Sequence, residues 1–66
     1  MRVNVNGRDE DVVQGMKVSD LIAHFKLDPR QVAVEVNREL VPRRTFAEKP
    51  LSEGDHIEIV TLVGGG

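Results

Sequence analysis

The sequence predicts an α+β fold: a mixed sheet of about five strands with one α-helix packed on one face, in the order β-β-α-β-β-β. Eleven residues are valine and three are isoleucine, and these β-branched side chains suit the half-buried surface of a sheet. The apolar spacing changes from period two to the helical period only once along the chain. We expect a single domain over 1–63, followed by a flexible glycine tail over 64–66, because 66 residues suffice for only one small domain.

Two strands are predicted at 2–6 and 8–13, joined by a tight hairpin. Valines alternate with polar residues in the first strand, as on a strand with one buried face. The pair Asn6-Gly7 then supplies the two positive-φ positions of a type I′ turn. The first four residues of the second strand are all charged, which is typical of a sheet edge. Val12 and Val13 are expected to return this strand to the core.

One α-helix is predicted at 18–26, because apolar residues recur there at i, i+3, i+4 and i+7. This stripe consists of Val18, Leu21, Ile22 and Phe25. The N-cap stays open between Lys17, which stands in the right place but caps poorly, and Ser19, which caps well but comes two residues late. The helix should end before Asp28, because the following Pro29 disfavours a helical residue in front of it.

The next predicted strand, at 32–36, has three valines on one face and alternates strictly with other residues. Asn37-Arg38 is a plausible turn into a short strand at 40–41. Pro42 ends that strand, because a residue without an N–H is tolerated only at an edge or an end.

A long connection over 43–53 leads to the last strand, predicted at 56–63. Phe46 and Leu51 are expected to anchor this connection in the core. A long central last strand has to lie beside the first strand and parallel to it, with the helix crossing one face of the sheet. This is the β-grasp arrangement.

Composition excludes several classes of function. A formal net charge of −2 does not supply the basic surface that nucleic-acid binding requires. The absence of cysteine excludes disulfides, thiolate metal sites and thiol nucleophiles. No apolar run has the length of a membrane span, so we expect a cytoplasmic protein. His24 and His56 lack the paired ligands of a metal site, and no catalytic constellation is present.

The sequence ends in Gly64, Gly65 and Gly66, directly after the last predicted strand. Glycines without side chains form a thin thread that could enter a narrow tunnel in a partner protein. A carboxylate at its tip needs activation by such a partner, because nothing in the sequence resembles a nucleotide site. A frayed end accounts for the three glycines equally well.

Four segments resemble the thiamine-biosynthesis sulfur carrier (ThiS) family. They are residues 15–22 (GMKVSDLI), 34–43 (VEVNRELVPR), 54–57 (GDHI) and the terminal Gly65-Gly66. The resemblance covers essentially the full length, and the combination is more specific than any one segment. Gly64 departs from the family pattern, in which a third glycine is not expected.

The resemblance implies that an E1-like adenylyltransferase, using ATP and Mg²⁺, adenylates the carboxylate of Gly66. A persulfide protein then donates sulfur to form a thiocarboxylate, and thiazole synthase takes that sulfur for the thiazole ring of thiamine. The chain itself would be a carrier and co-substrate, with no bound cofactor and no enzymatic activity. Three alternatives stay open: a carrier for another product, such as the small subunit of molybdopterin synthase, a ubiquitin-like modifier, and a plain binding module.

Two surfaces are candidates for docking the partners. If Ile57 and Ile59 face the helix, Val60 and Leu62 lie on the open face of the sheet, joined by Val41 or Leu40. Burial of these residues by twist or a bulge is the competing interpretation. Three basic residues near the Pro42 connection could steer an acidic partner surface, although a solvated basic loop explains them as well. They are Arg38, Arg43 and Arg44.

Overall fold

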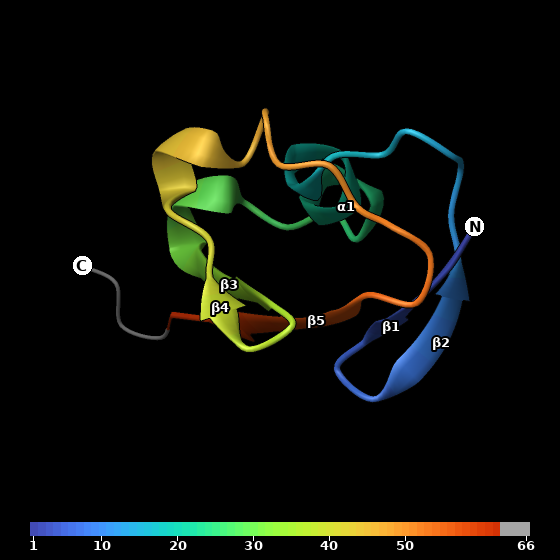
Figure 1. The fold of residues 1–66 in the computed structure, drawn as a ribbon. Coiled ribbons are helices and arrows are strands. Elements are labelled where there is room, and N and C mark those ends of the chain that lie inside the picture. Colours follow the sequence, from blue (N-terminus) through green and yellow to red (C-terminus); the bar gives the residue numbers. More distant parts are fainter. Residues whose placement is uncertain (63–66) are drawn as a thin grey trace.

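Residues 1–62, which the computed structural model describes, form a five-stranded mixed sheet with one α-helix packed on one face (Figure 1). The elements are β1 (Arg2–Val5), β2 (Arg8–Asp11), α1 (Val18–His24), the 3₁₀ helix η1 (Pro29–Gln31), β3 (Val32–Val36), β4 (Glu39–Leu40), the 3₁₀ helix η2 (Arg43–Thr45) and β5 (His56–Thr61). The strand order across the sheet is β2-β1-β5-β3-β4. The last strand is parallel to β1, as predicted, and it is antiparallel to β3.

Both hairpins turn through two residues with positive φ. Asn6 and Gly7 have φ values of 52° and 87°, which confirms the predicted type I′ turn. In the second hairpin, Asn37 and Arg38 have φ values of 53° and 70°. Arg38 carries a Cβ atom in the left-handed region, so this turn is strained where a glycine would be relaxed.

The charged strand β2 forms one edge of the sheet, as predicted. It ends at Asp11 and not at residue 13. Val12 is buried and donates its N–H to the carbonyl of Met1 at 2.8 Å. Beyond Val12 the chain leaves the sheet toward α1, so the side chain of Val13 is 70% exposed. The prediction that Val13 returns to the core is wrong.

Helix α1 begins after Lys17, and long-range contacts satisfy its first N–H groups. Val18 and Ser19 donate to the carbonyl oxygens of Lys49 and Phe46, both at 2.9 Å. The side chain of Asp20 accepts from the N–H of Lys17 at 2.9 Å. The 43–53 connection therefore provides caps that the helix sequence itself lacks.

The helix ends two residues earlier than predicted, at His24. Lys26 has a φ of 59°, a left-handed conformation that ends the helical path. The predicted apolar stripe of the helix is confirmed, because three of its four residues are buried and Phe25 is partly buried. Among residues 1–62, no helix has the length and apolarity that a membrane span requires.

The core lies between α1 and one face of the sheet. Phe46 and Leu51 are only 4% and 5% exposed, which confirms them as the anchors of the long connection. The other buried core residues are Val3, Val5, Val12, Val18, Leu21, Ile22, Val32, Val34, Val36, Val41, Ile57 and Ile59. Strands β1, β3 and β5 each supply alternate residues to this core, so the remaining residues of these strands point to the opposite, open face.

Candidate functional site

The face of the sheet opposite α1 is covered by no helix of the described residues (Figure 1). On β5, Val60 follows the buried Ile59 and is 58% exposed, and Leu62 beyond the strand is 44% exposed. The predicted exposure of both residues is thus confirmed. Leu62 also donates its N–H to the carbonyl of Gln31 at 2.7 Å, so the chain stays on the sheet to the end of the described residues.

Val41 does not belong to this face, contrary to the prediction. It is only 6% exposed and donates its N–H to the carbonyl of Val34 at 2.9 Å, which turns its side chain inward. Leu40, one residue earlier, pairs with Glu35 and is 68% exposed. A strand of two residues, Glu39–Leu40, shifts the face by one position relative to the predicted 40–41. Leu40 therefore takes the place of Val41.

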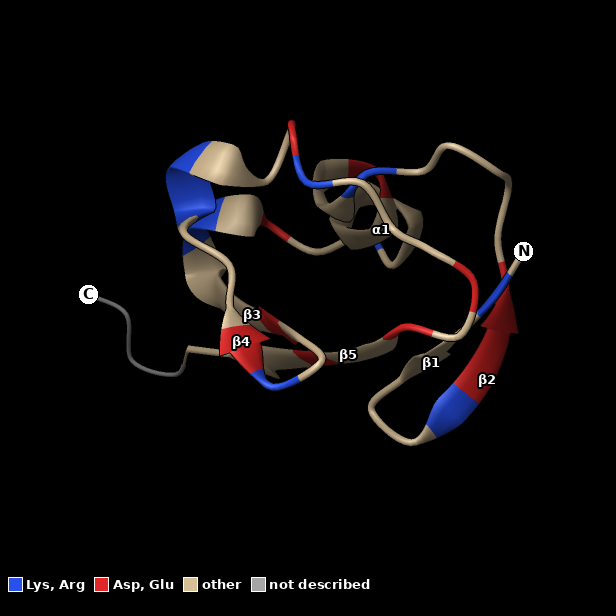
Figure 2. Ribbon diagram, in the orientation of Figure 1, with Lys and Arg blue, Asp and Glu red and all other residues tan. Residues whose placement is uncertain are grey.

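The three arginines do not form one basic surface. Arg43 is exposed, but its guanidinium binds backbone carbonyls, because Nε donates to the carbonyl of Pro29 at 3.0 Å and Nη2 to that of Val32 at 3.2 Å. Arg38 lies in the β3–β4 turn and Arg44 in η2, at separate places along the chain trace (Figure 2). Arg43 ties η2 to η1 and β3, and electrostatic docking by Arg38, Arg43 and Arg44 stays a prediction.

Two asparagines fix β5 from both sides. The side chain of Asn6 accepts from the N–H of Ile59 at 2.9 Å and donates to its carbonyl at 3.2 Å. The side chain of Asn37 accepts from the N–H of His56 and donates to Asp55, both at 3.0 Å. Sequence reasoning identified both asparagines only as turn residues. The side chain of Asn6 extends the pairing of β5 beyond β1 to Ile59, and the side chain of Asn37 holds the beginning of β5 at Asp55 and His56.

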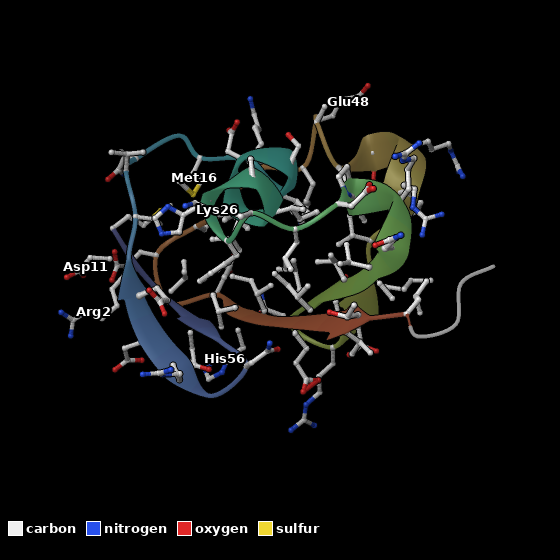
Figure 3. All side chains as sticks on the ribbon, turned by 180° about the vertical axis from the view of Figure 1, so that it is seen from behind. Arg2, Asp11, Met16, Lys26, Glu48 and His56 are labelled. Carbon is white, nitrogen blue, oxygen red and sulfur yellow. The ribbon has the colours of Figure 1, made fainter. Side chains whose placement is uncertain are left out.

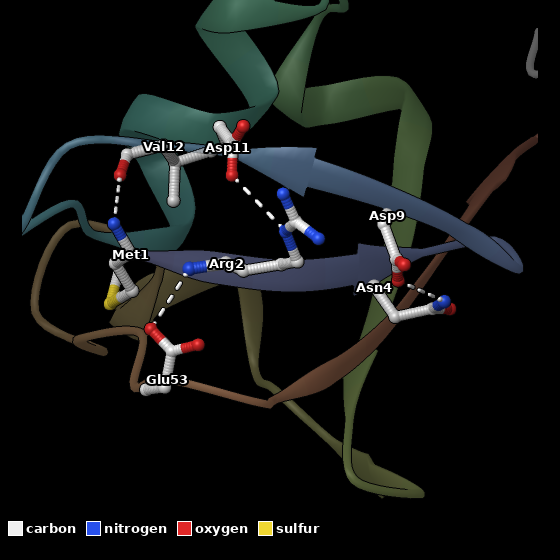
Figure 4. Close-up of polar contacts among 7 residues, drawn as sticks. All are labelled: Met1, Arg2, Asn4, Asp9, Asp11, Val12 and Glu53. Carbon is white, nitrogen blue, oxygen red and sulfur yellow. Dashed lines mark hydrogen bonds and ion pairs between the residues drawn. The ribbon is translucent and has the colours of Figure 1, made fainter.

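Acidic side chains on the outer face of the first hairpin have partners (Figure 4). Asp11 accepts from Nε of Arg2 at 3.2 Å, and Asp9 accepts from the side chain of Asn4 at 3.2 Å. The bond to Asp11 raises the pKa of the Arg2 guanidinium. In the loop before η1, hydrogen bonds from Arg30 lower the pKa of Asp28.

A different pattern holds in the centre of the open face. Glu35 on β3 and Glu58 on β5 are direct cross-strand partners, and neither forms an ion pair within residues 1–62. Beside them is a hollow of about 520 Å³ that reaches the two hairpin turns. It is lined by Asn4, Gly7, Glu35, Asn37, Arg38, His56, Ile57 and Glu58. No group of three or more His, Asp or Glu side chains in residues 1–62 could hold a metal ion.

The predicted reactive end, Gly64 to Gly66, lies outside the described residues. What the structure places is its attachment point, the exposed end of β5 at Thr61 and Leu62. The exposed apolar residues Val60 and Leu62 therefore stand next to the segment that carries the proposed chemistry.

Comparisons with known proteins agree with this architecture. The model of the ThiS family matches residues 3–66. A thiazole synthase of Paramagnetospirillum magneticum is 38% identical over 66 residues, covering all of this chain and 20% of that protein. The chain thus spans a fifth of the length of that relative. The sulfur carrier protein ThiS of Bacillus subtilis is 41% identical over 49 residues, 74% of each chain.

The fold comparison gives the same family. A crystal structure of the thiamine biosynthesis protein ThiS from Geobacter metallireducens superposes with a TM-score of 0.85 at 30% identity, covering 100% of both chains. The predicted β-grasp fold is confirmed by this match.

Proposed function

The chain belongs to the ThiS family of thiamine-biosynthesis sulfur carriers, and we propose that the carboxylate of Gly66 is the group that holds the sulfur. A free carboxylate is a poor electrophile, so a partner has to activate it. An E1-like adenylyltransferase transfers AMP from ATP to the Gly66 carboxylate and releases pyrophosphate. ATP and Mg²⁺ belong to that enzyme, and this chain acts as its co-substrate.

Sulfur then replaces the adenylate. The terminal sulfur of a protein persulfide attacks the acyl carbon and AMP leaves, which produces an acyl disulfide. A second thiol attacks the cysteine sulfur of the donor protein in this acyl disulfide. A protein disulfide forms, and the other sulfur leaves as the Gly66 thiocarboxylate. The thiocarboxylate is a good nucleophile because its sulfur is ionised at neutral pH. This route needs no cysteine in the carrier, and the chain contains none.

Thiazole synthase is the proposed acceptor of the sulfur. The support is the relative in which a segment similar to the whole of this chain makes up a fifth of a thiazole synthase. A carrier joined to its acceptor is held at high effective concentration. In a separate carrier, the open face with Val60, Leu62 and Leu40 is the proposed docking surface for the same task. Gly64 to Gly66 would then enter the active site of the partner.

The single observation that carries this proposal is the family match, which extends to the terminal glycines. Intact-mass spectrometry after incubation with ATP, Mg²⁺, an E1-like adenylyltransferase and a persulfide donor tests it. The thiocarboxylate adds about 16 Da, because sulfur replaces one oxygen. A variant lacking Gly65 and Gly66 is the matched control and should gain nothing.

Two outcomes would contradict the proposal. The first is no mass gain with an adenylyltransferase that activates the Bacillus subtilis carrier under the same conditions. The second is an isopeptide bond between Gly66 and lysines of other proteins, which would identify a modifier in place of a sulfur carrier.

A further inference from the structure

Two like charges face each other in the middle of the open face. Glu35 and Glu58 are paired in the antiparallel register of β3 and β5. Two residues further along the strands, Asn37 donates its N–H to the carbonyl of His56 at 2.7 Å, which identifies a hydrogen-bonded pair. Because such pairs alternate, Glu35 and Glu58 also form one, with Cα atoms roughly 5.5 Å apart. Like charges directly opposite each other in a sheet are destabilising.

No ion pair within residues 1–62 compensates this pair, although Arg38 lines the same hollow. Figure 2 shows acidic segments of β3 and β5 close together, and neither carboxylate has an ion-pair partner in the described part of the chain. The outward acids of β2 differ, because Arg2 and Asn4 on the neighbouring strand bind them. The centre of the sheet thus keeps an unfavourable arrangement that its edge avoids.

The surroundings of the pair have the shape and composition of a protein-docking surface. On one side of Glu35 and Glu58, the hollow is lined by the polar residues Asn4 and His56. Figure 3 shows His56 on the side of the sheet away from α1. In the other direction along the strands the face becomes apolar, with Val60 opposite Ala33. The acidic pair is therefore flanked by the exposed apolar residues next to the proposed reactive end.

We propose that thiazole synthase docks on this face with an arginine or lysine side chain seated between Glu35 and Glu58. This inference rests on the proposed function and adds the chemistry by which the partner is recognised. One cation removes the repulsion between the two carboxylates and gains attraction to both. An arginine fits best, because its planar guanidinium can donate to two carboxylates at once.

A protein cation fits this position better than a metal ion. Hard cations such as Ca²⁺ require six to eight oxygen ligands, and the hollow contributes only two carboxylates. The exposed side chains of Val60 and Leu40 beside the pair bury favourably only against another apolar surface. A partner with one basic side chain set among apolar ones complements both features.

The test measures both Tm and the Kd for thiazole synthase on the same charge-reversal variants. E35K and E58K each turn the like-charge pair into an opposite-charge pair. Each should raise Tm by about 1–5 °C and weaken the Kd for the cognate thiazole synthase about 10- to 100-fold. Glu48 is exposed in the connection on the α1 side of the molecule (Figure 3). E48K makes the same change in net charge and should alter Kd less than twofold.

Several outcomes overturn the proposal. Kd values for E35K and E58K within twofold of wild type would show that no cation sits between the residues. An equal loss for E48K would show that only net charge matters, and a lower Tm for both reversals would contradict the repulsion. The mass gain at Gly66 is measured separately on wild type. If it occurs while the reversals bind normally, the proposed function stands and this inference fails; if it is absent, the proposed function fails.

Discussion

Replacing Asn6 is expected to loosen the junction between the first hairpin and β5. Its side chain makes two partly buried hydrogen bonds to the backbone of Ile59, at 2.9 and 3.2 Å. Each such bond contributes about 0.5–1.5 kcal/mol. N6G removes both bonds and keeps the relaxed positive φ, so it should lower the free energy of unfolding by about 1–3 kcal/mol. N6A also places an alanine at a φ of 52°, which should cost about 1–2 kcal/mol more.

Circular dichroism is the suitable assay, because the chain has no tryptophan or tyrosine for fluorescence. For a domain of this size, N6G should lower Tm by about 4–20 °C. N37G is the matched control, because Asn37 occupies the same turn position and also makes two side-chain bonds, both exposed. Its loss should be smaller, below about 1 kcal/mol. Equal losses for N6G and N37G, or an N6A no less stable than N6G, would refute the reasoning.

Three further substitutions test other parts of the fold. R38G should raise the free energy of unfolding by about 1 kcal/mol in urea denaturation, because glycine relaxes the left-handed turn position; a loss would show that the arginine is held there by contacts. R43A should lower it by about 1–2 kcal/mol, since two backbone carbonyls lose their donor, and a lysine variant should recover only part of this. D28N tests pH dependence: the pKa of Asp28 is lowered by Arg30, so its contribution is present above the ordinary value of 3.8 and is lost as pH falls below it. The Tm difference between D28N and wild type should therefore shrink in acid, and a difference that grows there would contradict the pairing.

The sequence was sufficient for the strand faces wherever a strand is long. Period-two alternation in 32–36 and 56–61 placed buried and exposed residues correctly, including Val60. It failed at Val41 and Val13, where a strand is short or has ended. A strand of two residues contains no alternation to count, so its face is set by the register with its neighbour, which only the folded structure fixes.

Contacts between distant segments were the other part that the sequence did not reveal. The bonds of Arg43 end on carbonyls in η1 and β3, which approach it only after the chain has folded back. The helix N-terminus is satisfied in the same way, by carbonyls of the 43–53 connection. Local rules for capping and charge therefore showed Arg43 only as part of a basic loop and left the helix N-cap open between two residues.

Inward and outward residues alternate along β5, so core packing and the proposed docking depend on different residues of the same strand. Ile57 and Ile59 face the helix, so substitutions there lower stability by leaving cavities. Glu58 and Val60 face outward, where the like charge of Glu58 opposite Glu35 costs the isolated domain stability. Both this charge and the exposed side chain of Val60 become favourable under a complementary partner. Tm and the affinity for thiazole synthase should therefore change in opposite directions only at the outward positions. A scan over 56–61 in which both quantities respond uniformly would contradict the assignment of this face to docking.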